Sequence, residues 1–281
     1  MGAGAALRAT LRRTARSASQ PVSSRLPCES PTMPLSLHPI WAVVAGRMGS
    51  SRMRGKTMAE LAGRPSLLHI IERLRCVPSL DGIVIATTTE PEDDVICACG
   101  RSAGLPVYRG SADDVLARTL EAATWVGAVT IVAVSGDSPV TDPAIVQHVV
   151  EQYQCHRPDY ASSSLHGYRY PIGISVEVFP AALLELVERE ALEPRDREHV
   201  TLFFYEHPER FRLLDVGPSE RHHRPGLRLT LDTPEDYELI AALYDALYDS
   251  DPCFGLDAVL NYLDDHPQLE ELNSHVAQVI P

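Results

Sequence analysis

The sequence predicts an α/β fold built around a mostly parallel sheet. From Pro39 to about residue 158, apolar runs of strand length alternate with amphipathic segments of helix length. Strands separated by helices of about 10 to 15 residues require crossover connections, and these place the strands parallel to one another. A chain of 281 residues is long enough to bury a large hydrophobic core.

The elements of the first half follow from local patterns. Four apolar runs predict buried strands, at 40–45, 82–88, 105–110 and 129–137. Four segments with apolar residues at helical spacing predict helices, at 65–77, 91–103, 112–127 and 142–154. The helix over 91–103 begins with a proline and three acidic residues, which suits a helix start because carboxylates stabilise the unpaired N–H groups there.

After Pro158 the pattern changes to shorter pieces. Alternating segments predict strands at 159–164, 173–180, 211–216 and 227–232. Amphipathic segments predict helices at 181–190, 234–248, 256–266 and 268–280. The stretch 159–180 interrupts the α/β alternation, and its apolar strips are too short for a core of their own. We interpret this stretch as a small β-rich insertion through which two copies of the chain form a homodimer.

Three regions are expected along the chain. Residues 1–37 are rich in Ala, Arg, Ser and Pro and nearly free of acidic residues, a composition that resembles an organelle transit peptide. The interpretation that we favour is a disordered or misannotated extension, with Met33 as a second possible start. Residues 38–250 are expected to form the folded domain, and residues 251–281 a C-terminal helical tail.

Composition excludes several classes of protein. A formal net charge of -13 argues against a nucleic-acid or membrane-surface binder, since such proteins present excess Lys and Arg. No apolar run approaches the roughly 18 to 20 residues that span a bilayer. The six cysteines are scattered, with neither a disulfide framework nor a paired zinc spacing. A reducing, cytoplasmic setting is therefore expected.

One loop stands out against this acidic background. Between Ala45 and Lys56, directly after the first predicted strand, the chain gathers four basic side chains and three glycines. Glycines let the backbone approach an anion closely, and Arg47, Arg52 and Lys56 can pair with phosphate oxygens. The loop matches neither the dinucleotide-binding fingerprint nor a Walker loop, because the required glycine spacings are absent. The alternative is a solvated basic loop.

Two aspartates are placed at the ends of other predicted strands. Asp137 follows the run at 129–135, and Asp232 ends the segment "LTLD" just before a proline-started helix. Ligands of such sheets bind beyond the carboxyl ends of the strands. Magnesium usually takes one or two carboxylates together with substrate phosphates. The basic loop and the two aspartates therefore predict a site for Mg²⁺ and a triphosphate, although either aspartate can also serve only as a helix cap.

Six motifs together resemble one family. The motifs are "RMGSSRMRGK", "IVIATTTEPEDD", "VYRGSADDVLAR", "VSGDSPVTDP", "REHVT" and "LTLDTPED". Over roughly residues 40–247 they are similar to the spore-coat-polysaccharide type of cytidylyltransferase, which is akin to the synthetases that attach CMP to acidic sugars. The resemblance implies a Rossmann-like nucleotidyltransferase fold, a Mg²⁺ cofactor, CTP as donor, release of pyrophosphate and a homodimer.

The resemblance also assigns residues. The catalytic set would be Arg52, Lys56, Asp137 and Asp232, with Asp137 and Asp232 as metal ligands. The nucleotide would be bound by Arg47, Gly49, Ser50, Arg52, Lys56, Thr87, Thr88, Ser111, Asp114 and Arg118. The acceptor would be contacted by Tyr170, Ile172, Ser175, Glu177 and His199.

The chain departs from the family pattern in two places. Met53 and Arg54 stand where the family normally has Leu-Pro, so that Arg54 either adds a phosphate contact or points outward. At 170–177 relatives usually carry two carboxylates where this chain has Ile172 and Ser175. The loss of two negative charges suits a more anionic acceptor, or one with fewer hydroxyls to bind.

These observations predict a cytidylyltransferase that transfers CMP to a small anionic acceptor, such as an acidic sugar, a sugar phosphate or a phosphonate. Two alternatives remain open. The first is a transferase that uses another nucleoside triphosphate with a sugar phosphate. The second is a nucleotide-binding subunit without catalytic activity. Retention of Asp137, Asp232, Arg52 and Lys56 argues against the second.

Overall fold

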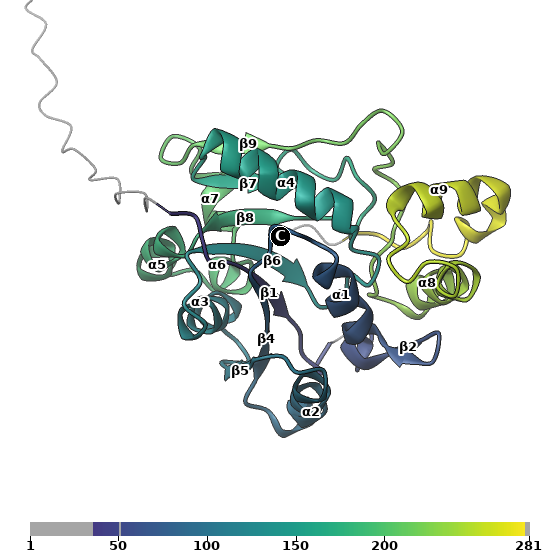
Figure 1. Cartoon of the computed structure of the whole chain (residues 1–281), viewed down its shortest axis with the longest axis horizontal. Coiled ribbons are helices and arrows are strands. Elements are labelled where there is room, and N and C mark those ends of the chain that lie inside the picture. Colours follow the sequence, from purple (N-terminus) through teal and green to yellow (C-terminus); the bar gives the residue numbers. More distant parts are fainter. Residues whose placement is uncertain (1–35, 51, 279–281) are drawn as a thin grey trace, which may run out of the picture. The chain divides into compact units, whose positions relative to one another are not determined.

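The computed structural model describes residues 36–50 and 52–278. Its largest sheet has seven strands in the order β5-β4-β1-β6-β8-β7-β9 (Figure 1). The strands are β1 (Ile40–Ala45), β4 (Gly82–Thr88), β5 (Val107–Gly110), β6 (Thr130–Ser135), β7 (Tyr160–Ser162), β8 (Glu177–Pro180) and β9 (Leu213–Asp215). Only β8 runs against the others, because it pairs antiparallel with both β6 and β7. The prediction of an α/β fold with a mostly parallel sheet is confirmed.

Helices cover both faces of the sheet. They are α1 (Ser66–Arg75), α2 (Asp94–Ser102), α3 (Val115–Trp125), α4 (Pro143–His156), α5 (Ala181–Glu190), α6 (Pro194–Glu198), α7 (Leu202–Glu206), α8 (Pro234–Leu247) and α9 (Leu256–Asp265). Strand β1 shows the division: Ala42 and Val44 face one hydrophobic cluster with α1, α4, α8 and α9. Val43, which lies between these two residues on the strand, faces a second cluster with α3, α5 and α7. Alternate residues of a strand point to opposite faces, so the two clusters are separated by the sheet.

The stretch 159–180 is part of this sheet and not an insertion beside it. β7 and β8 lie between β6 and β9, and Val178 and Phe179 of β8 are fully buried in the two clusters. The apolar side chains of β8 are therefore covered within the chain, by the clusters on the two faces of the sheet, and they need no partner surface. The homodimer stays a prediction.

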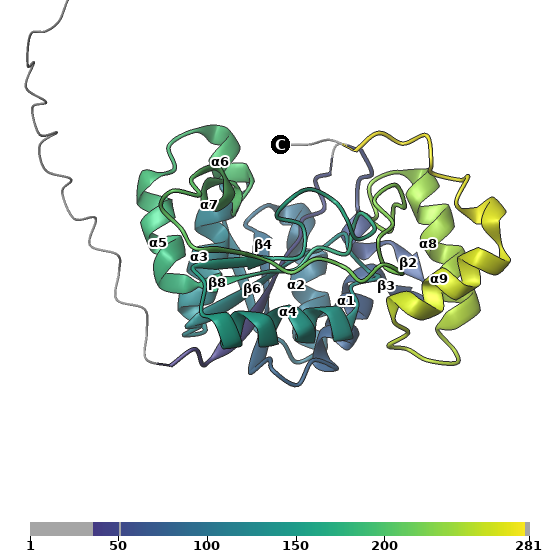
Figure 2. The ribbon, with the colours of Figure 1, turned by 90° about the horizontal axis from the view of Figure 1, so that it is seen from above.

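The C-terminal region differs from the expected tail of two helices. α9 buries Leu256, Val259, Leu260 and Leu263 in the larger cluster with α8, so it is packed into the domain core. The segment that follows contains one short 3-10 helix, Pro267–Leu269, then turns over residues 270–275, and no second α-helix as far as residue 278, where the described chain ends. Figure 2 shows this yellow segment passing above α8 toward the middle of the sheet.

Two further predictions about local structure need correction. The segment 227–232 is not a strand; only Arg228 forms a bridge, to Ile172. A two-stranded hairpin, β2 (Glu60–Leu61) with β3 (Arg64–Pro65), was not expected, and its turn places Ala62 and Gly63 at φ values of 44° and 73°.

The cysteines were expected to lack disulfides, and this is wrong for one pair. Cys76, at the end of α1, is bonded to Cys253, in the loop before α9. The two residues are 177 positions apart, so no local spacing signals the bond. Cys97, Cys99 and Cys155 are free thiols.

Two other expectations concern the borders of the domain and membranes. The extension 1–37 lies almost wholly outside the described residues, which begin at Ser36. Among the residues that the structure describes, no helix is both long and apolar enough to cross a bilayer.

Candidate active site

A cleft of about 290 Å³ lies at the carboxyl ends of β1 and β6. The loops that leave these strands meet there because two glycines, Gly46 and Gly136, allow their backbones to approach closely. A Cβ atom on Gly136 would lie 2.7 Å from the carbonyl oxygen of Ala45. The N–H of Gly136 instead donates to that oxygen at 2.7 Å. This contact aligns the basic loop after β1 with Asp137 after β6, and both line the cleft.

The basic loop is held by its own backbone. Gly55 adopts a φ of 78° at the start of the short 3-10 helix Lys56–Met58, and its N–H donates to the carbonyl of Met48 at 2.9 Å. The N–H of Met48 donates to Asp93 at 2.7 Å. The loop is therefore closed on itself and tied to the chain after β4, which directs Lys56 into the cleft.

Lys56 bridges the two predicted metal ligands. Its Nζ lies 2.6 Å from Asp137 Oδ2 and 2.7 Å from Asp232 Oδ1. Burial opposes the charge of Lys56, but the two carboxylates outweigh this and raise its pKa. Burial likewise opposes the charge of Asp137, and Lys56 with Ser135 holds the pKa of that carboxyl below its usual value. Lys56 and Asp137 thus each favour the charged state of the other.

Asp232 is surrounded by cations. Oδ1 accepts from Lys56 and lies 2.9 Å from a guanidinium nitrogen of Arg52. Oδ2 lies 3.5 Å from Arg228, whose side chain is 2% exposed. Two of the cations predicted to bind the nucleotide, Arg52 and Lys56, are therefore paired with the carboxylates predicted to bind metal.

This donor set fits Mg²⁺. Within the described part of the chain no group of three or more His, Cys, Asp or Glu side chains converges as a metal cage. Mg²⁺ needs no such cage, because it is commonly held by one or two carboxylates together with substrate phosphates and water. The ammonium of Lys56, at 2.6 and 2.7 Å from the two carboxylates, marks a place for a cation between them.

Five of the ten residues predicted to bind the nucleotide line this cleft: Arg47, Ser50, Arg52, Lys56 and Arg118. Arg118 donates to the carbonyl of Ser111, while its buried Nε has no partner among the described residues. Arg54 points away and pairs with Glu92 at 2.5 Å, with 79% of its side chain exposed. The extra arginine therefore adds no cation to the cleft.

The other predicted nucleotide residues have structural contacts. The hydroxyl of Thr88 donates to Asp93, and Asp114 caps α3 while pairing with Arg197 at 2.8 Å. The hydroxyl of Ser111 accepts from the N–H of Asp114 at 3.1 Å. Thr87 is fully buried, and its hydroxyl has no hydrogen-bond partner within the described ranges. Gly49 lies against Glu92, whose carboxylate would be 2.8 Å from an added Cβ.

The residues predicted to contact the acceptor lie outside this 290 Å³ cleft. Tyr170 is 6% exposed and packs in the larger hydrophobic cluster, so it is a core residue. Ile172 is 8% exposed and pairs through its backbone with Leu227 and Leu229. Ser175 and His199 are partly buried. Neither Tyr170 nor Ile172 offers much surface to an acceptor.

Glu177 is the one carboxylate left in that strip. Its Oε1 accepts hydrogen bonds from Tyr160 at 2.8 Å and Thr201 at 2.9 Å, and no cation pairs with it among the described residues. Burial raises the pKa of Glu177, and the two hydrogen bonds oppose this only in part. Tyr168 lies nearby: burial raises its pKa, and so do the charges of Glu177, Asp137 and Asp232. Tyr168 therefore lies within electrostatic reach of all three carboxylates.

This raised pKa predicts a pH-dependent effect of Glu177→Gln. Above the ordinary value of 4.5 the unfolded carboxyl loses its proton while the folded one keeps it, so stability falls as pH rises toward the folded pKa. Glutamine keeps an oxygen for both hydroxyls and carries no charge. We expect the melting temperature of the variant, relative to wild type, to increase between about pH 4 and pH 8. A difference that is constant with pH would contradict this assignment.

Four side chains that line the cleft were not anticipated: Thr57, Val115, Ser135 and Glu198. Glu198, at the end of α6, lines the cleft, whereas the sequence pointed to its neighbour His199. Ser135 donates to Asp137 Oδ1 at 2.5 Å. Ser135 could have been predicted as a cleft residue, because it lies at the end of a predicted strand. Nothing in the local pattern indicates which side chain of "REHVT" turns toward the cleft.

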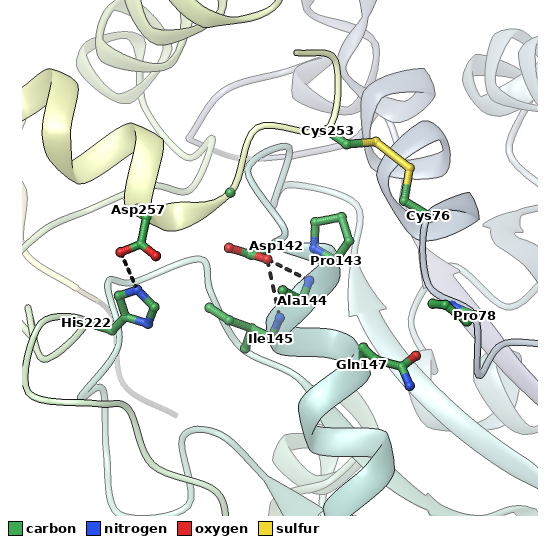
Figure 3. A pocket seen from close by; sticks show the side chains of 11 residues that line it. Cys76, Pro78, Asp142, Pro143, Ala144, Ile145, Gln147, His222, Cys253 and Asp257 are labelled. Carbon is green, nitrogen blue, oxygen red and sulfur yellow. Dashed lines mark hydrogen bonds and ion pairs between the residues drawn. A yellow bond between two sulfur atoms is a disulfide. The ribbon is translucent and has the colours of Figure 1, made fainter.

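A larger cavity of about 450 Å³ shares no residue with this cleft (Figure 3). The disulfide between Cys76 and Cys253 lies on its rim, together with Asp142 and Asp257. Asp142 caps α4 through the N–H groups of Ala144 and Ile145, and Asp257 is paired with His222 at 3.0 Å. Its charged groups are thus already paired, and the basic cleft remains the candidate active site.

Comparisons with known proteins agree with this geometry. A sequence model of a family described as cytidylyltransferase matches residues 41–263. Spore coat polysaccharide biosynthesis protein SpsF of Bacillus subtilis is 34% identical over 213 residues, which cover 74% of this chain and 87% of that protein. A 3-deoxy-manno-octulosonate cytidylyltransferase of Solibacter usitatus is 28% identical over 247 residues, covering 74% and 95% of the two chains.

A solved structure supports the same relationship. A cytidylyltransferase from Leptospira borgpetersenii superposes with a TM-score of 0.77 at 27% identity, over 86% of this chain and 99% of that one. The region that the family model matches, residues 41–263, includes the basic loop, Asp137 and Asp232.

Proposed function

Because the chain belongs to the cytidylyltransferase family, we propose that it transfers CMP from CTP to a small anionic acceptor and releases pyrophosphate. The observation that carries this proposal is the convergence of Lys56 and Arg52 with Asp137 and Asp232 at the carboxyl ends of the strands. A triphosphate needs cations, a divalent metal needs carboxylates, and this cleft presents both.

The residues have separate tasks in the proposed reaction. Arg47, Arg52, Lys56 and Arg118 line the cleft and would neutralise the phosphate oxygens of CTP. An acceptor oxygen attacks the α-phosphorus, a new P–O bond forms, and the bond to the bridging oxygen breaks as pyrophosphate departs. The cations stabilise the charge that develops on the departing group, and binding in one cleft sets the line of attack.

Asp137 and Asp232 would hold Mg²⁺ together with the triphosphate. When bound, the metal supplies positive charge that stabilises the transition state. Two separate parts of the chain bring the carboxylates to Lys56, since Asp137 follows β6 and Asp232 precedes α8. Lys56 must then leave the carboxylates, and the phosphates offer its ammonium new partners.

The acceptor is proposed from two features. The relative from Solibacter usitatus acts, by its name, on 3-deoxy-manno-octulosonate, and an acidic sugar of this type fits a basic cleft. The four basic side chains that line the cleft favour an anionic acceptor such as an acidic sugar, a sugar phosphate or a phosphonate. The link to polysaccharide biosynthesis rests on the relative SpsF. A homodimer and a cytoplasmic location belong to the same proposal.

The proposal is tested by pyrophosphate release with each of the four nucleoside triphosphates and a panel of such acceptors. We expect release with CTP and one class of acceptor, and only in the presence of Mg²⁺ or Mn²⁺. Release with another triphosphate and a sugar phosphate would instead support the alternative transferase. Binding of CTP without release for any acceptor would support a subunit that has lost catalysis.

A further inference from the structure

The two oxygens of Asp232 face different surroundings. Oδ1 lies on the cleft side, within 2.7 Å of Lys56 and 2.9 Å of Arg52. Oδ2 lies on the buried side, 3.5 Å from Arg228. The side chains of Asp232 and Arg228 are only 4% and 2% exposed, so water cannot replace this partner. The orientation of the carboxylate therefore depends on what fixes Arg228.

Asp236 fixes the guanidinium of Arg228. Its two oxygens accept from Nε at 3.1 Å and from Nη2 at 3.0 Å, a bidentate pair that sets the plane of the guanidinium. One of these oxygens also accepts from the N–H groups of Asp232 and Thr233, each at 3.1 Å. Asp236 thus holds both the backbone of Asp232 and the cation beside its carboxylate.

The segment after α9 completes this network. Asn273, 1% exposed, donates to Asp236 Oδ1 at 2.8 Å and to the carbonyl of Arg228 at 3.1 Å. Gln278 accepts from Arg228 at 2.5 Å and donates to the hydroxyl of Tyr168 at 3.4 Å. The end of the described chain therefore contacts the groups behind Asp232 and also Tyr168, which senses the charges of Asp137 and Asp232.

We infer that Arg228 is a positioning residue for Asp232, and that residues 273–278 are part of the active site because they hold Arg228 in place. With Oδ2 directed at Arg228 at 3.5 Å, Oδ1 is the oxygen that faces Lys56 and Arg52. Asp232 would then offer a metal this one oxygen. This inference rests on the proposed function, since it assigns a geometry to one of the proposed ligands.

A purely structural role would have a different signature. A buried network that only stabilises the fold would change the melting temperature without changing how a folded molecule binds a metal. A positioning role requires that metal affinity fall in molecules that are still folded. Mn²⁺ binding in the presence of CTP, followed by electron paramagnetic resonance of free Mn²⁺ and corrected for the Mn²⁺ that CTP alone chelates, reports this quantity without any acceptor.

The variants are Arg228→Lys, Asn273→Leu and Gln278→Ala in the full chain. Lysine keeps the charge beside Asp232 but cannot form the bidentate pair. Leucine has the same number of side-chain heavy atoms and the same branching as asparagine but is bulkier, and it donates no hydrogen bond. Gln278 lies near the end of the described chain, so its loss leaves the core intact. The control is Thr130→Val, which removes one buried hydrogen bond, from the hydroxyl to the carbonyl of Leu37 at 2.7 Å, at the opposite end of β6.

We expect Mn²⁺ to bind at least about tenfold more weakly to Arg228→Lys and Asn273→Leu than to wild type. The loss of Mn²⁺ affinity in Gln278→Ala should be smaller. The affinity for CTP in the presence of a chelator should stay within about twofold of wild type. Thr130→Val should lose thermal stability but keep its affinity for Mn²⁺. Unchanged Mn²⁺ affinity in the folded variants, Gln278→Ala included, would overturn the inference. A wild-type protein that binds neither CTP nor Mn²⁺ would overturn the proposed function as well, so the two failures are distinguishable.

Discussion

Asparagine in place of Asp137 is expected to slow pyrophosphate release by about a thousandfold or more. The substitution removes one negative charge from the proposed metal site while keeping the shape of the side chain. Metal-held charge stabilises such transition states by several kcal/mol, and each 1.36 kcal/mol is a factor of about ten in rate. Asp232→Asn should have a similar effect, because Asp232 is the second carboxylate around the ammonium of Lys56.

The fold should survive the change at Asp137. Ser135 donates to Oδ1 and Lys56 to Oδ2 of the present carboxylate, and asparagine keeps an oxygen for one of these two donors. Asp245→Asn is a suitable control, because it removes the same charge from an exposed position on α8. Rates are compared at saturating CTP and Mg²⁺ once the acceptor is known. A rate within tenfold of wild type in both Asp137→Asn and Asp232→Asn would exclude them as the metal ligands.

Alanine in place of Lys56 is expected to have opposite effects on two ligands. CTP should bind about ten- to a hundredfold more weakly, because a charge-assisted hydrogen bond contributes about 1.5 to 3 kcal/mol and 1.4 kcal/mol is a factor of ten. Free Mn²⁺ should bind more tightly than in wild type. The reason is that Lys56 lies between Asp137 and Asp232 at 2.6 and 2.7 Å, and a metal without nucleotide must displace it.

Arg54→Ala provides a matched control for this experiment. Arg54 belongs to the same loop and carries the same charge, but it pairs with Glu92 and is 79% exposed. We expect its CTP affinity to stay within about twofold of wild type. Titrations of each ligand alone separate the two effects of Lys56→Ala. If the variant binds Mn²⁺ less tightly than wild type, Lys56 does not compete with metal for the carboxylates, and the account of the ligand-free site is wrong.

Asp137 and Asp232 were accessible from the sequence for a simple reason. Each follows an apolar run and precedes a helix that begins with a proline, so each was expected beyond the sheet. Asp232 was placed correctly even though its run forms only a single bridge, at Arg228. The disulfide between Cys76 and Cys253 and the pair of Asp114 with Arg197 were not accessible, because their partners are far apart in the chain.

The sequence by itself determined the α/β alternation, the parallel strands β1, β4, β5 and β6, and the basic loop facing two aspartates. These features arise from local patterns: runs of apolar residues, helical spacing, and polar loops at strand ends. Only the tertiary structure decided that β7, β8 and β9 extend the same sheet, that Tyr170 is buried, and that Asn273 supports Asp232 through Arg228 and Asp236. These outcomes depend on which distant segments cover one another's apolar surface and satisfy one another's buried polar groups, and a linear pattern carries no record of that pairing.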